Sequence, residues 1–444
     1  GCPKNQVDSE LILGRFERDG AEIVEDLEQA DTLVVNTCAF IDRAREESVE
    51  ALLEAEAWKQ RVPGRQIVAA GCLVQRSGEE LAAELPEIDA FIGLDRITAP
   101  AEGSPPPATT SGRLPLPSAA PRAGAGSDRR LALPSSPPQA EPATALLSHL
   151  DPRRRLSPPW TAFVKIAEGC NQTCAFCAIP SFRGRMRSRP LEDLFAELTA
   201  LAAEGVVEAN LIAQESTSYG RDIGVRDGLA KLVRAADGLE TAPPWIRVHY
   251  LYPGRISRGL LEALGEARRV VPYIDLPLQH ADEGVLRRMR RPGDAESYLR
   301  QLEELREAMP GAATRSGFIV GFPGETDAAF ERLCEFVPEA GFDSVGVFTY
   351  SHEEGTHAGV GLEDDVPPEL KEERRQHLEE LCASVAHQRA LERVGEAIEA
   401  LVEGDADDVP GARQGRWPGQ SPEIDGRVVL HGAGASAPGE RVRA

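Results

Sequence analysis

The sequence predicts an α/β protein in three parts: an N-terminal domain with an open parallel α/β sheet, a partial (β/α)6 barrel, and a small C-terminal β domain. Three observations lead to this prediction. Apolar, strand-like runs alternate with helical stretches over the first hundred residues, and again from Trp160 onward. A segment rich in Pro, Ser, Ala and Gly separates the two alternating regions. Short strand-like runs among Gly and Pro turns follow the last long helix.

The length and charge of the chain restrict its function. At roughly 150 residues per domain, 444 residues correspond to about two to four domains. No apolar run reaches the roughly 18 residues that span a bilayer, which excludes a membrane protein. The chain carries 49 Lys and Arg against 72 Asp and Glu, a formal net charge of −23. This acidity disfavours a general nucleic-acid binder and suits a basic partner.

Residues 1–98 are predicted to form the N-terminal domain. The pattern of apolar residues indicates helices over 7–16, 42–58 and 79–85, and strands over 31–38, 66–72 and 90–94. Alternating strands and helices imply a parallel sheet covered by helices. Cys2 precedes the first helix, where the end of a strand is expected. We therefore expect this domain to lack its first strand.

Residues 99–150 are predicted to be a disordered linker. They hold 11 of the 34 prolines and show no apolar period. Such a segment cannot bury enough surface to offset the entropy of ordering.

Residues 151–383 are predicted to form the barrel. Strands are expected over 163–167, 208–213, 246–251, 273–276, 317–320 and 345–350, and helices over 190–203, 228–236, 257–267, 295–308 and 327–339. A full barrel needs eight such units. Six units fit a partial barrel better than a doubly wound sheet.

Residues 384–444 are predicted to form the C-terminal β domain. A long amphipathic helix over 369–391 leads into it, and strands are expected over 397–402 and 426–431. The chain leaves little room for a closing strand, so we expect this domain to be truncated. Ten acidic and six basic residues lie between Leu391 and Ala444.

The strongest chemical signal is the Cys-x3-Cys-x2-Cys spacing of Cys170, Cys174 and Cys177. It directly follows the first predicted barrel strand, at the mouth where barrel enzymes place their active sites. A structural zinc site closes with a fourth ligand, and neither a His nor another Cys lies nearby in the sequence. Three thiolates and one open position fit a [4Fe–4S] cluster that binds an exchangeable ligand. The alternative is three buried thiols without metal.

This arrangement resembles the radical S-adenosylmethionine (SAM) superfamily. The resemblance implies that SAM binds the open iron and is cleaved, after one electron arrives, to methionine and a 5′-deoxyadenosyl radical. It also implies that Phe176 lies beside the adenine, and that an electron donor of flavodoxin or ferredoxin type serves as partner. In the segment 319–326, Gly321 and Gly324 would let the backbone approach a ligand closely. The resemblance places the adenine and ribose of SAM there.

Three distant cysteines, Cys2, Cys38 and Cys72, form a second candidate set. Cys38 and Cys72 each follow a predicted strand, and ligands bind at the carboxyl ends of parallel strands. Taken singly, each is more simply a core thiol. Taken together beside the triad, they favour a second [4Fe–4S] cluster, and two thiolate-bound clusters imply a reducing, cytoplasmic setting.

The combination resembles the methylthiotransferases, which join a three-cysteine domain, a radical-SAM barrel and a small TRAM (OB-like) domain. The segments 1–10, 36–40, 168–174 and 319–326 carry the resemblance. One branch of the family modifies adenosine in transfer RNA, and another modifies an aspartate of small-subunit ribosomal protein twelve. The segments 2–5, 38–42 and 179–184 resemble the second branch. An acidic β module also suits a basic ribosomal protein better than RNA.

The resemblance implies an enzyme that inserts sulfur at the β-carbon of that aspartate and methylates it. Cys170, Cys174 and Cys177 would hold the SAM-binding cluster, and Cys2, Cys38 and Cys72 the sulfur-donating cluster. The small ribosomal subunit would be the partner, and the chain would act as a monomer. Two alternatives remain: the transfer-RNA reaction, and a non-catalytic iron–sulfur redox or sensor protein.

Several polar residues stay without an assigned role at this stage. Arg183, Arg185, Arg187 and Arg189 would share one face if extended, either to contact SAM, substrate or ribosomal RNA, or as a salt-bridged edge. Glu215 stands where the family more often has aspartate. His280, near a strand end, is more simply structural.

Overall fold

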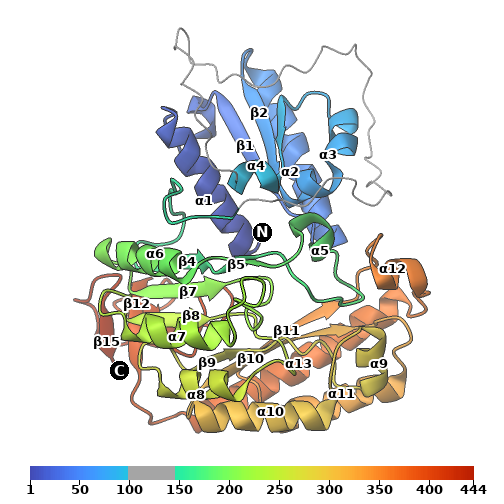
Figure 1. The fold of residues 1–444 in the computed structure, drawn as a ribbon, viewed down its shortest axis with the longest axis vertical. Coiled ribbons are helices and arrows are strands. Elements are labelled where there is room, and N and C mark those ends of the chain that lie inside the picture. The colour runs from blue at the N-terminus through green and yellow to red at the C-terminus, as the bar shows by residue number, and fades with distance from the viewer. Residues whose placement is uncertain (99–145) are drawn as a thin grey trace.

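The computed structural model describes residues 1–98 and 146–444. Most of the predicted linker, 99–145, lies outside these residues. Figure 1 shows the N-terminal domain above the barrel, with α5 (Ile179–Arg183) between the two. Among the described helices, none is long and apolar enough to cross a membrane.

The N-terminal domain is a three-stranded parallel sheet in the order β1-β2-β3. Its elements are α1 (Pro3–Arg18), the 3-10 helix η1 (Leu27–Gln29), β1 (Thr32–Thr37), α2 (Asp42–Arg61), β2 (Gln66–Gly71), α3 (Cys72–Glu84), β3 (Ala90–Ile92) and α4 (Leu94–Thr98). Helix α1 begins at a proline, which suits the first helical turn. Helix α3 begins seven residues before the predicted start and has a break in its helical geometry at Ser77. Its first turns bury the polar Gln75 and Arg76, so they lack the apolar period that sequence analysis detects.

The barrel has six parallel strands in two three-stranded sheets, β4-β7-β8 and β9-β10-β11. The strands are β4 (Thr161–Lys165), β7 (Glu208–Ile212), β8 (Trp245–Val248), β9 (Tyr273–Asp275), β10 (Ala313–Val320) and β11 (Ser344–Thr349). A parallel bridge between Ile246 and Val270 and a hydrogen bond from Leu251 N to Asp275 O (2.9 Å) join the two sheets. The predicted partial six-stranded barrel is confirmed.

Helices cover the outside of the barrel, and their apolar faces make its main core. They are α6 (Leu191–Ala203), α7 (Gly228–Gly238), α8 (Arg258–Glu266), α10 (Ala295–Ala308) and α11 (Asp327–Ala340). The short elements β5 (Ala167–Glu168), β6 (Arg187–Ser188), α9 (Glu283–Arg288) and α12 (His357–Gly361) lie in the loops.

A continuous helix, α13 (Pro368–Glu392), connects the barrel to the C-terminal domain and packs against β11 and α11. The predicted boundary at 383/384 therefore falls inside a helix. The C-terminal domain is an antiparallel sheet in the order β14-β13-β12-β15. Its strands are β12 (Glu399–Asp405), β13 (Arg413–Arg416), β14 (Val428–Leu430) and β15 (Arg441–Arg443).

Strand β15 pairs with β12 and forms one edge of this sheet, and the expected truncation of the domain stays a prediction. Strands β13 and β15 were not expected from the sequence because they are short and rich in Arg, without an alternation of apolar and polar residues.

Buried ion pairs fasten the C-terminal domain to the barrel. Glu208 of β7 accepts hydrogen bonds from Arg247 Nη2 (2.8 Å) and from Arg416 Nη2 of β13 (2.6 Å). All three side chains are buried. Burial would raise the pKa of Glu208, but the two guanidinium groups outweigh it and lower the pKa to about 2.

Candidate active site

The cysteine triad lies on the loop that follows β4 and β5, at the carboxyl end of the barrel strands. Cys170 N donates to Gly184 O (3.0 Å), and Ala175 N donates to Met289 O (2.9 Å), so both ends of the loop are fixed by backbone contacts. Gly169 has a positive φ of 79°, and a Cβ there would lie 2.3 Å from the Arg185 carbonyl oxygen. Only glycine allows this approach.

The three thiols of the triad are half-buried and interact electrostatically. Burial, with smaller contributions from neighbouring Glu215 and Cys174, raises the pKa of Cys170 to about 11. Burial and Cys174 also raise the pKa of Cys177 above its usual range. Metal ligation requires thiolates. A cationic metal centre would therefore keep the three thiols deprotonated at the same time.

The donor set fits a cluster better than a single ion. Within the described residues, no group of three or more His, Cys, Asp or Glu side chains is arranged to hold one metal ion. A [4Fe–4S] cluster is bound by thiolates at separate iron corners, so its ligands need not converge on one point. Three thiols on one loop satisfy that requirement.

The second set of cysteines also comes together. Cys2 is the N-cap of α1, Cys38 follows β1, and Cys72 begins α3 directly after β2. Burial raises the pKa of Cys38, and raises that of Cys72 to about 12, with contributions from the neighbouring cysteines. Burial also opposes ionisation of Cys2, but Lys4 and Arg183 outweigh it and lower the pKa of that thiol.

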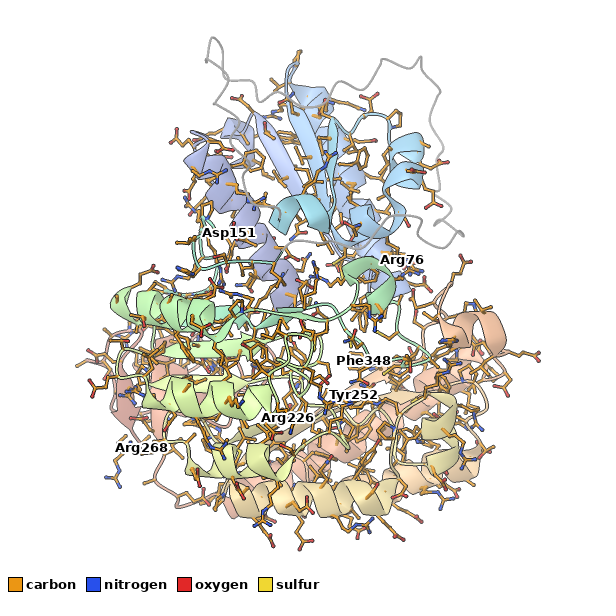
Figure 2. The ribbon with its side chains drawn as sticks, viewed as in Figure 1. Arg76, Asp151, Arg226, Tyr252, Arg268 and Phe348 are labelled. Atoms are coloured by element: carbon orange, nitrogen blue, oxygen red, sulfur yellow. The ribbon has the colours of Figure 1, made fainter. Side chains whose placement is uncertain are left out.

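The carboxyl ends of the N-terminal strands face the mouth of the barrel. Glu353, in the loop after β11, is buried and pairs with Arg45 of α2 and with Arg76 of α3 (3.1 Å). Arg76 also donates to the carbonyl of Ala39, which follows Cys38 (3.0 Å). Figure 2 shows Arg76 where the N-terminal domain meets the barrel. The loop of Cys38 is thus held against the barrel.

The four arginines after the triad do not form one extended run, so the condition for a shared face is not met. Arg183 ends helix α5, Gly184 after it has a positive φ of 75°, and strand β6 begins only at Arg187. Arg183 and Arg189 are buried, whereas Arg185 is exposed. Arg189 pairs with Asp193 and Glu197 of α6 and supports the barrel wall.

The residues predicted to contact SAM lie on neighbouring segments. Phe176 is half-buried in an apolar cluster with Phe322 and Tyr350, so the triad loop meets the segment 319–326. Gly321 and Gly324 have positive φ values of 69° and 77°. A Cβ at Gly321 would lie 2.3 Å from Cγ of Lys371, and one at Gly324 would lie 3.0 Å from Arg288. The positive φ values and these contacts account for the two glycines, and their contact with SAM stays a prediction.

Glu215 and His280 differ in their relation to the triad. Glu215 accepts from Gln172 Nε2 of the triad loop (3.0 Å) and from Ser218 N (3.0 Å). His280 is fully buried and lies 3.3 Å from Glu325, which accepts from Gly321 N (2.9 Å). Glu215 thus supports the triad loop, and His280 supports the glycine segment.

One cation at the triad was not expected from the sequence. Arg291 lies above the ring of Tyr252, 4.3 Å from its centroid, and its Nη1 is 3.8 Å from Cys174 Sγ. Its sequence neighbourhood is a short run of arginines after α9, which gives no signal of a role at the cysteines.

Comparison with known proteins decides the family. Residues 164–337 match the Radical SAM superfamily, and residues 1–93 match Uncharacterized protein family UPF0004. The whole chain is 43% identical to ribosomal protein uS12 methylthiotransferase RimO of Sorangium cellulosum and covers 86% of that protein. The proteins of the same name from Anaeromyxobacter sp. strain K and Symbiobacterium thermophilum are 42% and 43% identical over the whole chain, with 88% and 86% of their lengths covered.

The chain belongs to the uS12 methylthiotransferase family. As a family member with a radical SAM segment, it is an enzyme that uses SAM and iron–sulfur clusters. Among solved structures, the radical SAM methyltransferase TsrM of Kitasatospora setae is similar, with a TM-score of 0.54 and 15% identity over 81% of this chain and 74% of that one. At that identity the likeness shows the fold alone.

Proposed function

We propose that this methylthiotransferase adds a methylthio group to the β-carbon of an aspartate in ribosomal protein uS12. The observation that carries the proposal is the placement of two cysteine trios at one interface, between the carboxyl ends of the N-terminal sheet and the mouth of the barrel. The names of the relatives favour the ribosomal protein over transfer RNA as substrate.

Each trio holds one [4Fe–4S] cluster in this proposal. Cys170, Cys174 and Cys177 bind the cluster that chelates SAM, and Phe176, Gly321 and Gly324 line the site of its adenosine. Cys2, Cys38 and Cys72 bind the second cluster. When bound, the clusters and SAM supply the electron, the radical, the sulfur and the methyl group.

The protein's own residues orient these groups. Glu215 and Gln172 fix the triad loop, and Arg291 places a positive charge beside Cys174. The buried pairs of Glu353 keep the N-terminal domain on the barrel mouth. This arrangement keeps the two thiol sites facing each other.

The acidic C-terminal sheet domain, residues 384–444, is TRAM-like and suits a basic ribosomal protein by charge. The chain acts as a monomer in the cytoplasm, where two thiolate-bound clusters stay reduced, and receives electrons from a donor of flavodoxin or ferredoxin type.

Iron and acid-labile sulfide per chain, measured after anaerobic reconstitution, test the two clusters. We expect about eight irons in the wild type and about four in a Cys170/Cys174/Cys177 triple-alanine variant, because each cluster contributes four. About four irons in the wild type and none in the variant would leave a single site and refute the second cluster.

The substrate is tested by incubating the reconstituted enzyme with SAM and either purified uS12 or transfer RNA. Methylthiolation of uS12 alone supports the proposal. Modification of the RNA alone favours the other branch of the family. Failure to form any 5′-deoxyadenosine would favour a redox or sensor protein.

A further inference from the structure

A buried arginine, Arg183, lies between the two cysteine sites. Arg183 is the last residue of α5, the short helix that follows the triad. Phe182 beside it is buried in the apolar cluster of the N-terminal domain, so α5 belongs to the barrel chain but packs into the neighbouring domain. The side chain of Arg183 is buried as well.

Arg183 contacts the N-terminal site directly. Its Nη2 donates to Cys72 Sγ (3.0 Å) and to Asp8 Oδ2 of α1 (2.8 Å). Its Nη1 donates to Glu168 Oε1 of β5 (2.9 Å). Lys165 of β4 pairs with both carboxylates and completes a buried group of two cations and two anions.

The same segment also contacts the triad. Gly184, the next residue, accepts the hydrogen bond from Cys170 N (3.0 Å). Glu168 Oε1, which Arg183 holds, also accepts from Gly169 N (3.3 Å), the residue before Cys170. Arg183 thus contacts Cys72 of the N-terminal site directly. Its sequence neighbour Gly184 and its partner Glu168 hold the triad loop.

We propose that Arg183 is a positioning residue of the N-terminal cluster that holds the Cys72 thiolate and raises the reduction potential of that cluster. This inference rests on the proposed function, because it requires Cys72 to be a cluster ligand. Reduction adds one negative charge to a cluster, and hydrogen bonds to the ligand sulfur and a nearby cation favour the reduced form. The guanidinium supplies both.

Asp8 and Glu168 are the two carboxylates that pair with Arg183, and removing the charge of one of them should shift the potential in the opposite direction. Without Arg183 the buried group retains Lys165 and two carboxylates, a net negative charge beside the cluster. Without the charge of Asp8 it retains two cations and one carboxylate, a net positive charge. The two changes should therefore shift the potential in opposite directions, which a general loosening of the interface would not do.

The experiment measures the midpoint potential of the N-terminal cluster by a redox titration followed by electron paramagnetic resonance. The full chain with Cys170, Cys174 and Cys177 replaced by alanine serves as parent, so that only the N-terminal site is loaded with iron and sulfide. Into it are introduced Arg183→Met, Arg183→Lys, Asp8→Asn and, as control, Arg185→Met at the exposed member of the same run.

We expect a more negative potential for Arg183→Met, a more positive one for Asp8→Asn, and no shift for Arg185→Met. Arg183→Lys should fall between Arg183→Met and the parent, because it keeps the charge but loses the planar fork of donors. If Arg183→Met does not retain iron, the midpoint potentials of Asp8→Asn and Arg183→Lys test the inference in its place.

An unchanged potential in the iron-loaded variants, or shifts of the same sign for Arg183→Met and Asp8→Asn, would overturn the inference and leave the proposed function intact. A parent that binds no iron would overturn the second cluster itself, and the inference with it.

Discussion

Glu208 should be essential for the attachment of the C-terminal domain, and the variant Glu208→Gln tests this. The carboxylate is buried between Arg247 and Arg416, and its pKa falls from an ordinary 4.5 to about 2. At 1.36 kcal/mol per pKa unit, that shift corresponds to about 3 kcal/mol of stability. Removing one partner of a buried ion pair costs roughly 3–5 kcal/mol. We therefore expect Glu208→Gln to lower the free energy of unfolding at pH 7 by about 3 kcal/mol.

The sign of the pH dependence follows from the direction of the shift. A carboxyl group whose pKa is lowered in the folded state contributes its full stability above the unfolded pKa, near 4.5, and loses it as the pH falls toward 2. The difference between wild type and variant should therefore shrink by more than half between pH 7 and pH 3.

Urea unfolding followed by tryptophan fluorescence is a suitable assay. Three of the four tryptophans, Trp160, Trp245 and Trp417, pack in one apolar cluster at this junction. Glu262→Gln, which removes an exposed partner of Arg258, is the matched control and should cost less than about 1 kcal/mol. A loss below about 1 kcal/mol for Glu208→Gln, or a difference that does not change with pH, would refute the reasoning.

Three further predictions concern the cysteine sites. Cys174→Ala should abolish SAM cleavage, whereas Cys38→Ala should still form 5′-deoxyadenosine but yield no methylthiolated product by mass spectrometry; equal loss of both activities in Cys38→Ala would contradict separate roles. Gly169→Ala should lose at least half of the triad's iron, because its Cβ would lie 2.3 Å from a carbonyl oxygen, while Gly205→Ala, at a positive φ in open space, should keep it. In the metal-free protein, iodoacetamide at pH 8 should alkylate Cys2 before Cys38, because the pKa of Cys2 is lowered and that of Cys38 is raised. Peptide mapping after timed quenching gives the order, and modification of Cys38 first would refute it.

The fold was predictable where apolar residues recur at a fixed period. All six barrel strands were expected close to where they lie, because buried parallel strands are continuous apolar runs. Elements held by polar contacts escaped detection. The first turns of α3 bury Gln75 and Arg76, and β13 and β15 are short and basic, so neither shows an apolar period.

The candidate site likewise has one part that a local sequence pattern predicts and one part that depends on contacts between distant residues. The spacing of Cys170, Cys174 and Cys177 is local and specific, and it is readable from the sequence. The role of Arg183 is not, because its partner Asp8 lies 175 positions earlier in the chain and meets it only after the two domains dock. An alternating run of arginines predicts a shared face only if the backbone is extended, and here Arg183 ends helix α5 and Gly184 after it has a positive φ of 75°.

The continuity of α13 has a practical consequence for exchanging modules between relatives. The helix runs unbroken to Glu392, and Arg393 just after it lies over the ring of Trp417 in the C-terminal domain. A chimera joined at residue 383 would fuse two half-helices of different origin across the face that packs on β11 and α11. A recipient that keeps its own barrel should therefore accept the foreign C-terminal module only with a junction placed before Pro368 or after the helix ends. In the second case the donor must also supply a cation at the position of Arg393.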